Sequence, residues 1–265
     1  MNDLTNTQLG QYQLLEAIGH GGMATVYKAY QPALDRLVAV KVLRASGDPQ
    51  FAVRFQREAH TIARLQHPNI LPIYDYGEQG DQAYFVVQFI EGGATLIASA
   101  GQSADAAYAL RLIGQVLGAL EYAHSYGVIH RDIKPGNILL PKPDWPMLAD
   151  FGIAKLMTAD GNTTSPAEAP LTQQAGTLLS PGYAAPEQVQ SGTVSTATDV
   201  YALGVLLYVL LSGHHPTTRP GSSASQALHD TLQRDAPLMS RTAQGDETAA
   251  AARGLRSATF KRALE

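Results

Sequence analysis

The stretch HRDIKPGNILL at residues 130–140 decides how this sequence is interpreted, and a second polar motif, ADFG, follows at residues 149–152. Phosphoryl transfer needs a carboxylate at the incoming hydroxyl and oxygen ligands for a metal at the phosphates. Asp132 suits the first need, and Asn137 with Asp150 suits the second. Alternatively, the two aspartates are turn residues and Asn137 caps a loop. The occurrence of both motifs in this order favours the chemical interpretation.

A glycine-rich segment, GHGGMATV, lies upstream at residues 19–26. Glycines let a backbone approach phosphates closely, although a pattern this loose is more often an ordinary hairpin turn. The segment lies between two strand-like runs, whereas a dinucleotide-binding or Walker loop would lead into a helix. The apolar strand VAVK at residues 38–41 follows it, which strengthens the phosphate-binding interpretation.

Lys41 lies inside an otherwise apolar strand, and a lysine there must either reach solvent or meet an anion. A helix is predicted around residues 51–65, with Phe55 and Ile62 on its inward face. Glu58 shares that face. Each charge alone could be solvated, but one inward cation and one inward anion together predict an ion pair.

Composition narrows the class of protein. The 265 residues carry a formal net charge of −4 and include no cysteine. The charge argues against a nucleic-acid partner, and the missing cysteines exclude a disulfide scaffold and thiolate metal sites. No secretory signal pattern opens the chain, and the longest uncharged apolar run, Val200–Leu211, is shorter than the ~20 residues of a membrane span. We expect a cytoplasmic domain, and an anchor outside this sequence remains compatible with that.

The chain up to Ile90 alternates like a sheet with one helix, because short β-branched and aromatic runs are separated by Gly, Pro or Asp. The predicted strands are residues 12–19, 24–31, 37–43, 70–77 and 83–90. Past Gly92-Gly93 the pattern is helical. One apolar stripe is predicted to contain Leu110, Ile113, Leu117 and Leu120. Residues 201–211 are apolar on all sides, which predicts a helix buried throughout.

These motifs, together with Ala185-Pro186-Glu187, resemble the protein kinase family, and more closely the eukaryotic-like Ser/Thr protein kinases of bacteria. The matching signature runs from about Tyr12 to Pro216. The resemblance implies a two-lobed α+β fold, with a β-rich N-lobe containing one main helix and a mostly helical C-lobe. The expected divisions are an N-terminal extension at 1–11, the N-lobe at 12–91, the C-lobe at 92–218 with its activation segment at 150–187, and a weakly patterned tail at 219–265.

The resemblance also implies residue roles. Asp132 would be the catalytic base, Lys134 would neutralise the γ-phosphate, and Asn137 with Asp150 would bind Mg²⁺ or, alternatively, Mn²⁺. Lys41 would hold the α- and β-phosphates, clamped by Glu58. The residues implied in ATP binding are Ile18, Gly19, Gly21, Gly22, Val26, Ala39, Lys41, Glu58, Val87 as gatekeeper, Gln88, Ile90 and Leu139.

The activation segment carries a substrate platform in this family. Counting seven residues back from Glu187 assigns Ser180 the substrate-facing hydroxyl, which could bond with the catalytic-loop residues. Arg131 precedes the catalytic aspartate, an arrangement that goes with control by loop phosphorylation. Thr172 or Thr177 is the expected phosphorylation site. The alternative is that the Ser/Thr content merely keeps the loop soluble.

Asp199 has two interpretations. It could cap the N-terminus of the apolar helix, since Asp accepts hydrogen bonds from free amides there. The resemblance implies instead that it braces the backbone of the catalytic loop. The two roles are compatible, and neither makes it catalytic.

The implied function is that of an ATP-dependent kinase which phosphorylates Ser/Thr hydroxyls of protein substrates and its own activation loop. The alternatives are a kinase-like binding or scaffold protein, or an inactive truncated fragment. A metabolite kinase fits less well, because Ala185-Pro186-Glu187 and the long loop build a peptide platform. Since no segment after Thr217 matches the family's last helices, we expect a truncated C-lobe, a Glu187 without its arginine partner, and a tendency to self-associate.

Overall fold

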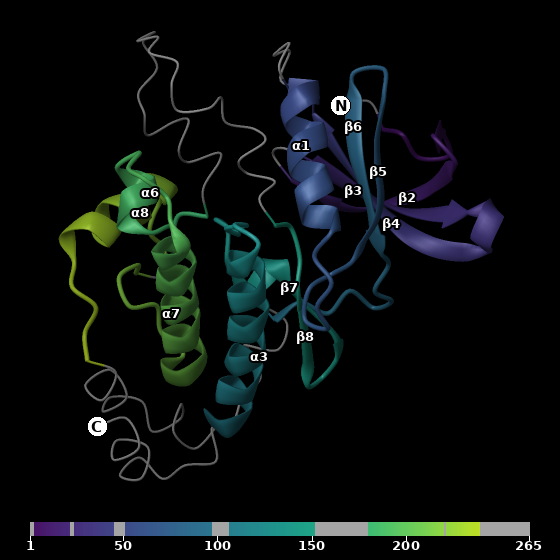
Figure 1. Cartoon of the computed structure of the whole chain (residues 1–265). Helices are drawn as coiled ribbons and strands as arrows, with labels where there is room; N and C mark the ends of the chain where they lie inside the picture. The colour runs from purple at the N-terminus through teal and green to yellow at the C-terminus, as the bar shows by residue number, and fades with distance from the viewer. Residues whose placement is uncertain are drawn as a thin grey trace, which may run out of the picture. The chain divides into compact units, whose positions relative to one another are not determined.

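The chain folds as two compact units, which divide between Gly92 and Gly93. The computed structural model describes residues 3–21, 24–44, 51–96, 106–151, 180–219 and 221–238. The first unit is β-rich and the second is mostly helical, as the ribbon in Figure 1 shows for each. The predicted α+β class is confirmed.

The first unit is built on a six-stranded antiparallel sheet with the strand order β1-β2-β3-β4-β6-β5. Its strands are β1 (Gln8–Leu9), β2 (Tyr12–His20), β3 (Ala24–Gln31), β4 (Arg36–Arg44), β5 (Ile73–Gln79) and β6 (Gln82–Gln88). The short 3-10 turn η1 (Pro32–Leu34) joins β3 to β4. Every central strand therefore pairs with two neighbours, which fixes the register of β4 and the position of Lys41 within it.

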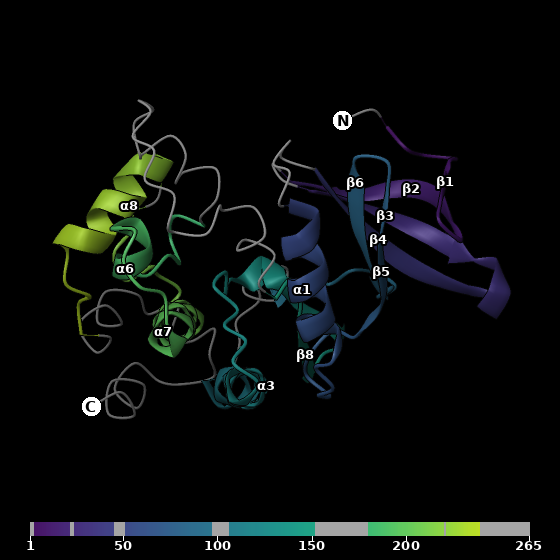
Figure 2. The same ribbon diagram turned by 45° about the horizontal axis from the view of Figure 1, so that its top comes forward.

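The two faces of β4 meet different clusters, because successive side chains of a strand point in opposite directions. On one face, the fully buried valines Val38, Val40 and Val42 join aromatic residues of β2 and β3. On the other face, Leu43 packs with Phe85 and with Phe55 of helix α1 (Phe51–Ala63). Figure 2 shows α1 lying beside the sheet. Lys41 is two residues from Leu43 and so belongs to the face that α1 covers.

The observed elements differ from the prediction at several places in this unit. The fifth strand begins at Ile73 instead of residue 70, because Pro72 has no N–H to give to a strand ladder. The helix ends at Ala63, two residues early. Strand β1, which was not predicted, lies inside the segment assigned as an N-terminal extension and forms the edge of the sheet.

The second unit contains four helices and one hairpin in its described part. They are α3 (Ala106–Ser125), the 3-10 turn η2 (Pro135–Asn137), strands β7 (Ile138–Lys142) and β8 (Trp145–Leu148), α6 (Pro186–Val189), α7 (Thr196–Ser212) and α8 (Ala224–Gln233). Helices α3 and α7 pack against each other (Figure 1). The polar motifs of the sequence flank the β7–β8 hairpin, with residues 130–137 before it and Asp150 after it.

The predicted stripe on α3 is wrong at two of its four positions. Ile113 and Leu120 are buried, but Leu110 and Leu117 are 54% and 49% exposed. The buried face also contains small residues that a search for large apolar side chains overlooks, namely Ala109, Ala119 and Ala123. Alanine is the best helix former and allows close packing, so the true buried face is shifted around the helix.

Helix α7 begins and ends at clear signals. The side chain of Ser195 caps its N-terminus, and Gly213 ends it in the left-handed conformation, with φ at 75°. The expectation that residues 201–211 are buried on every side is wrong at Gly204, which is exposed, and Val200 just before this range is 56% exposed. Throughout the described part of the chain, no helix is both long enough and apolar enough to cross a bilayer.

Candidate active site

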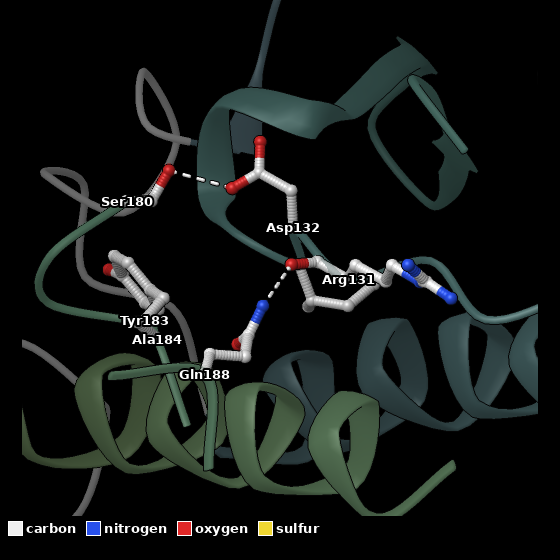
Figure 3. A pocket seen from close by; sticks show the side chains of 7 residues that line it. Arg131, Asp132, Ser180, Tyr183, Ala184 and Gln188 are labelled. Atoms are coloured by element: carbon white, nitrogen blue, oxygen red, sulfur yellow. Dashed lines mark hydrogen bonds between the residues drawn. The ribbon is translucent and has the colours of Figure 1, made fainter. Parts of the chain in front are cut away.

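The carboxylate of Asp132 is the centre of a hydrogen-bonded group in the loop between α3 and η2. Its Oδ2 accepts from Asn137 Nδ2 at 2.9 Å and lies 2.7 Å from Lys134 Nζ. Its Oδ1 accepts from the hydroxyl of Ser180 at 2.7 Å (Figure 3). Asn137 also donates to the Asp132 carbonyl at 2.8 Å. These contacts fix both the position and the orientation of the carboxylate.

Lys134 connects the same residues from the other side. Its ammonium donates to the Ser180 hydroxyl at 2.7 Å, so this hydroxyl both accepts from Lys134 and donates to Asp132. The three side chains therefore form a closed ring of contacts. The structure thus brings together Asp132, Lys134, Asn137 and Ser180, four of the residues singled out in the sequence.

Asp199 holds the backbone of this loop. Its carboxylate, which is fully buried, accepts from the amides of His130 and Arg131, both at 2.8 Å, and contacts His124 Nε2 at 2.8 Å. Arg131 has a φ of 70°, a conformation that costs a non-glycine residue about 1–3 kcal/mol and persists only when its surroundings determine it. The capping interpretation of Asp199 is wrong, since Ser195 is the N-cap.

His130 is completely buried and was not assigned a role from the sequence. Its Nε2 lies 2.8 Å from the carbonyl of Ala149, so this nitrogen carries the hydrogen, and its Nδ1 accepts from the Asp132 amide at 3.3 Å. Burial lowers the pKa of His130, against the charge of Asp199, which raises it. The neutral ring thereby links the catalytic loop to the residue that precedes Asp150.

Asn137 and Asp150 lie at the same end of the β7–β8 hairpin. The Ala149 amide donates to the Asn137 carbonyl at 2.8 Å, which continues the pairing of Ile138 with Leu148. The side-chain nitrogen of Asn137 is engaged with Asp132, so its amide oxygen is the atom left to bind a metal. An amide oxygen and a carboxylate are the donors that Mg²⁺ prefers, and the donor set therefore fits such an ion.

A small pocket opens beside Asp132, and it is lined by Arg131, Asp132, Ile133, Ser180, Tyr183, Ala184 and Gln188. Gln188 is a second residue that the sequence did not reveal. Its Nε2 donates to the Arg131 carbonyl at 2.8 Å (Figure 3), and its Oε1 accepts from the Ala185 amide at 3.0 Å. Together with the Ser180 hydroxyl, this amide fastens the segment 180–188 to the catalytic loop at both ends.

Glu187 has a partner that the sequence did not predict. The hydroxyl of Thr198, in the first turn of α7, donates to its carboxylate at 2.5 Å. Glu187 is itself in the first turn of α6, where the free amides of a helix favour a negative charge. The carboxylate of Glu187 is therefore held by α7 within the described part of the chain.

The residues expected to contact phosphates in the first unit lie on its central strands. Gly19 pairs with Val26, and Lys41 lies between Val26 on β3 and Phe85 on β6. The Gly21 amide, just past the end of β2, donates to the Ala24 carbonyl at 2.8 Å. Gly22 lies outside the described residues.

Glu58 is on α1, the helix that covers the Lys41 face of β4, and its side chain is 16% exposed. Its Oε1 contacts Arg57 Nη2 at 3.2 Å. The predicted ion pair between Lys41 and Glu58 stays a prediction.

The remaining predicted residues lie on strands or just after them. Ala39 pairs with Val87, and Gln88 pairs with Val38. Ile90 follows β6, Leu139 is on β7, and Ile18 on β2 has a side chain that is 47% exposed. Thr172 and Thr177 lie outside the described residues.

Comparisons with known proteins agree with this geometry. A family model described as "Protein kinase domain" matches residues 12–256, which continues past the end of the signature found in the sequence. Serine/threonine-protein kinase PrkC of Bacillus subtilis is 40% identical over 236 residues, which cover 88% of this chain. Serine/threonine-protein kinase PknL of Mycobacterium tuberculosis is 37% identical over 239 residues, which cover 89% of this chain.

Among solved structures, the crystal structure of the Mycobacterium tuberculosis PknI kinase domain aligns with a TM-score of 0.64 and 28% identity, covering 100% of this chain and 98% of that chain. The matched regions make up 35% of PrkC and 57% of PknL, so the chain spans only part of those proteins. The family model nevertheless covers most of this sequence, and Lys134, Asn137 and Ser180 are gathered around Asp132. The chain belongs to the protein kinase family.

Proposed function

We propose that this chain is an ATP-dependent protein serine/threonine kinase. The observation that carries the proposal is the arrangement at Asp132, where a carboxylate, the Lys134 ammonium and a hydroxyl from Ser180 are mutually within 2.7 Å. A serine hydroxyl already occupies the position next to the carboxylate. Such a site can receive the hydroxyl of a substrate serine or threonine.

The proposed reaction uses this arrangement directly. The substrate hydroxyl gives its proton to Asp132, its oxygen forms a bond to the γ-phosphorus of ATP, and the bond from that phosphorus to the bridging oxygen breaks to release ADP. The Lys134 ammonium stabilises the negative charge on the transferred group. A Mg²⁺ ion held by Asn137 and Asp150 would neutralise charge on the phosphates.

The nucleotide is proposed to contact the first unit through the glycine segment and through Lys41, oriented by Glu58. Support comes from the hydrogen bond between Gly21 and Ala24 and from the register that places Lys41 beside Val26. The adenine would contact apolar side chains, and the proposed set is Ile18, Val26, Ala39, Val87, Ile90 and Leu139, with the backbone of Gln88. The 47% exposed Ile18 is one apolar surface available for it. Because ATP is the substrate, we also propose a cytoplasmic location.

Regulation by phosphorylation of Thr172 or Thr177, carried out by the kinase itself, is a further part of the proposal. Arg131 would bind the resulting phosphate, since a guanidinium suits such an anion. In Figure 3 the Arg131 guanidinium points away from Ser180 and the pocket.

The proposed function is tested by transfer of label from γ-labelled ATP to a generic protein substrate rich in serine and threonine. We expect transfer in the presence of Mg²⁺ and its loss when a chelator removes the metal. Lys41→Met should lower the rate by about a hundredfold or more, while Lys142→Met, which changes an exposed lysine of β7, should not. Absence of label with Mg²⁺, or equal label after chelation, would contradict the proposal.

A further prediction concerns Ser180. Ser180→Ala removes the hydroxyl that bonds with Asp132 and Lys134, and we expect kcat/KM for a protein substrate to fall about tenfold. Ser180→Thr keeps the hydroxyl and should retain most of the activity. Ser125→Ala, at an exposed position of α3, is the matched control. Steady-state kinetics check this, and the role of the hydroxyl is refuted if the alanine and threonine variants behave alike.

A further inference from the structure

His215 lies in the loop that follows α7, and its half-buried ring contacts Gly182 and Tyr183 in the segment 180–184. Its Nε2 is 2.7 Å from the Gly182 carbonyl. Its Nδ1 accepts from the amides of Thr217 and Thr218 at 3.3 Å and 3.0 Å. The His215 ring thus joins the segment 180–184, which lies beside Asp132, to the loop that follows α7.

These hydrogen-bond partners determine the protonation state and the tautomer of the His215 ring. A carbonyl can only accept, so Nε2 carries a hydrogen, and amides can only donate, so Nδ1 carries none. The ring is neutral in this arrangement. A proton added to Nδ1 would face two N–H donors and would remove their acceptor.

The contact is closely fitted. The ring of Tyr183 meets the His215 ring edge to face, with 5.7 Å between centroids and 80° between planes. A Cβ atom placed on Gly182 would lie 3.1 Å from His215 Nε2, so only a glycine lets the carbonyl approach this nitrogen without displacement. Gly182 lies between Ser180 and Gln188, which bind the catalytic loop. His215 is therefore the third anchor of the platform and the only one of the three that can titrate.

We propose that His215 is a positioning residue for the protein substrate, whose neutral ring holds the segment 180–184 in its substrate-binding arrangement and whose protonation releases it. The inference rests on the proposed kinase function. His215 touches no reacting atom and acts through Gly182 and Tyr183. The expected result is a pH-dependent affinity for protein substrate that ATP affinity does not share.

The surroundings of His215 fit a ring that stays neutral. The titratable or charged groups on the elements around it, within the described structure, are Tyr183 in the segment 180–184, His214 and Arg219 in the same loop, and His229, Asp230 and Arg234 of the α8 region. Arg234 reaches the loop through the Thr217 carbonyl at 3.1 Å and lies 3.6 Å from Asp230, so its charge is partly balanced. His214 Nδ1 contacts the Ser212 carbonyl instead.

Burial lowers the pKa of His215, and the hydrogen bond to Gly182 opposes this effect. His215 in the unfolded chain, or in a loop released from Gly182, therefore takes up a proton at a higher pH than His215 bonded to Gly182. The anchored state is fully favoured above the ordinary histidine pKa of about 6.5 and becomes less favoured as pH falls below it.

The test uses the whole chain and a peptide with one phosphorylatable serine, with KM measured separately for peptide and ATP between about pH 5.5 and 8. For the wild type, KM for the peptide should rise as pH falls below about 6.5, while KM for ATP stays level. His215→Gln, which can still donate to Gly182 but cannot titrate, should remove that rise. His215→Phe should raise KM for the peptide about tenfold at every pH.

His214→Gln is the matched control and should follow the wild type. A rise in peptide KM that persists in His215→Gln would overturn the proposal, as would a peptide KM in His215→Phe within about twofold of the wild type while the variant folds. If His215→Phe does not fold, the pH profile of His215→Gln decides. A ¹⁵N spectrum of the imidazole at neutral pH tests the bonding without activity, since a charged ring or an Nδ1–H tautomer refutes it. If the wild type phosphorylates no peptide at any pH, the proposed kinase function is contradicted. The ¹⁵N spectrum then still tests whether the His215 ring is neutral with its hydrogen on Nε2.

Discussion

Replacing Asp132 with asparagine is expected to lower kcat for protein phosphorylation by about a thousandfold and to leave the affinity for ATP nearly unchanged. The asparagine side chain has the same shape but cannot take the proton of a substrate hydroxyl. Its amide oxygen can still accept from Lys134 and Asn137, while its amide nitrogen would face the Ser180 hydroxyl. Steady-state kinetics give kcat, and calorimetric titration with ATP gives the affinity.

Asp144→Asn is the control for this experiment, because Asp144 is an exposed aspartate in the turn between β7 and β8. It should retain wild-type kcat and ATP affinity. Activity of Asp132→Asn within about tenfold of the wild type would show that another group accepts the proton. Loss of ATP binding in Asp132→Asn would show instead that the residue serves the nucleotide site.

Replacing Asp199 with alanine is expected to destabilise the protein by about 3–5 kcal/mol, because it leaves the buried amides of His130 and Arg131 without an acceptor. For a chain of this size, that loss corresponds to a fall in Tm of roughly 10 °C. The left-handed backbone of Arg131 would also lose a support, so activity should fall with stability. Thermal unfolding followed by circular dichroism measures the change.

Asp199→Asn refines the interpretation, since it keeps one acceptor oxygen and should fall between the wild type and the alanine variant. Glu121→Ala, on the exposed side of α3, should leave Tm within about 2 °C of the wild type. A Tm for Asp199→Ala equal to the wild-type value would mean that the two amides find other acceptors, and the bracing role would then be wrong.

The catalytic loop could be predicted because its functional residues lie close together in the sequence. Asp132, Lys134 and Asn137 lie within six positions, and the 3-10 turn at residues 135–137 brings the amide of Asn137 back onto Asp132. Ser180 could be found by counting from Glu187, since a fixed spacing in one segment determines where its hydroxyl lies. Local spacing thus carried the information that the site required.

The roles of His215 and Gln188 could not be predicted, because these residues contact partners that are distant in the sequence. The bond between His215 and Gly182 spans 33 positions, and that between Gln188 and Arg131 spans 57. Only tertiary packing brings such groups together, and glutamine or histidine at a given position does not reveal a partner. The prediction of the buried face of α3 failed for another reason. Its alanines are too small to dominate a hydrophobic pattern.

The measurement that tests the central claim most directly is transfer of γ-labelled phosphate from ATP to a peptide with a single serine, with the same peptide carrying alanine as the blank. Phosphoamino acid analysis identifies the labelled residue. We predict phosphoserine with the wild-type chain and Mg²⁺, no label on the alanine peptide, and a rate about a thousandfold lower with Asp132→Asn. Label on serine at an equal rate with Asp132→Asn, or no label from a wild-type chain that binds ATP, would contradict the assignment of Asp132 as the base of a protein serine/threonine kinase.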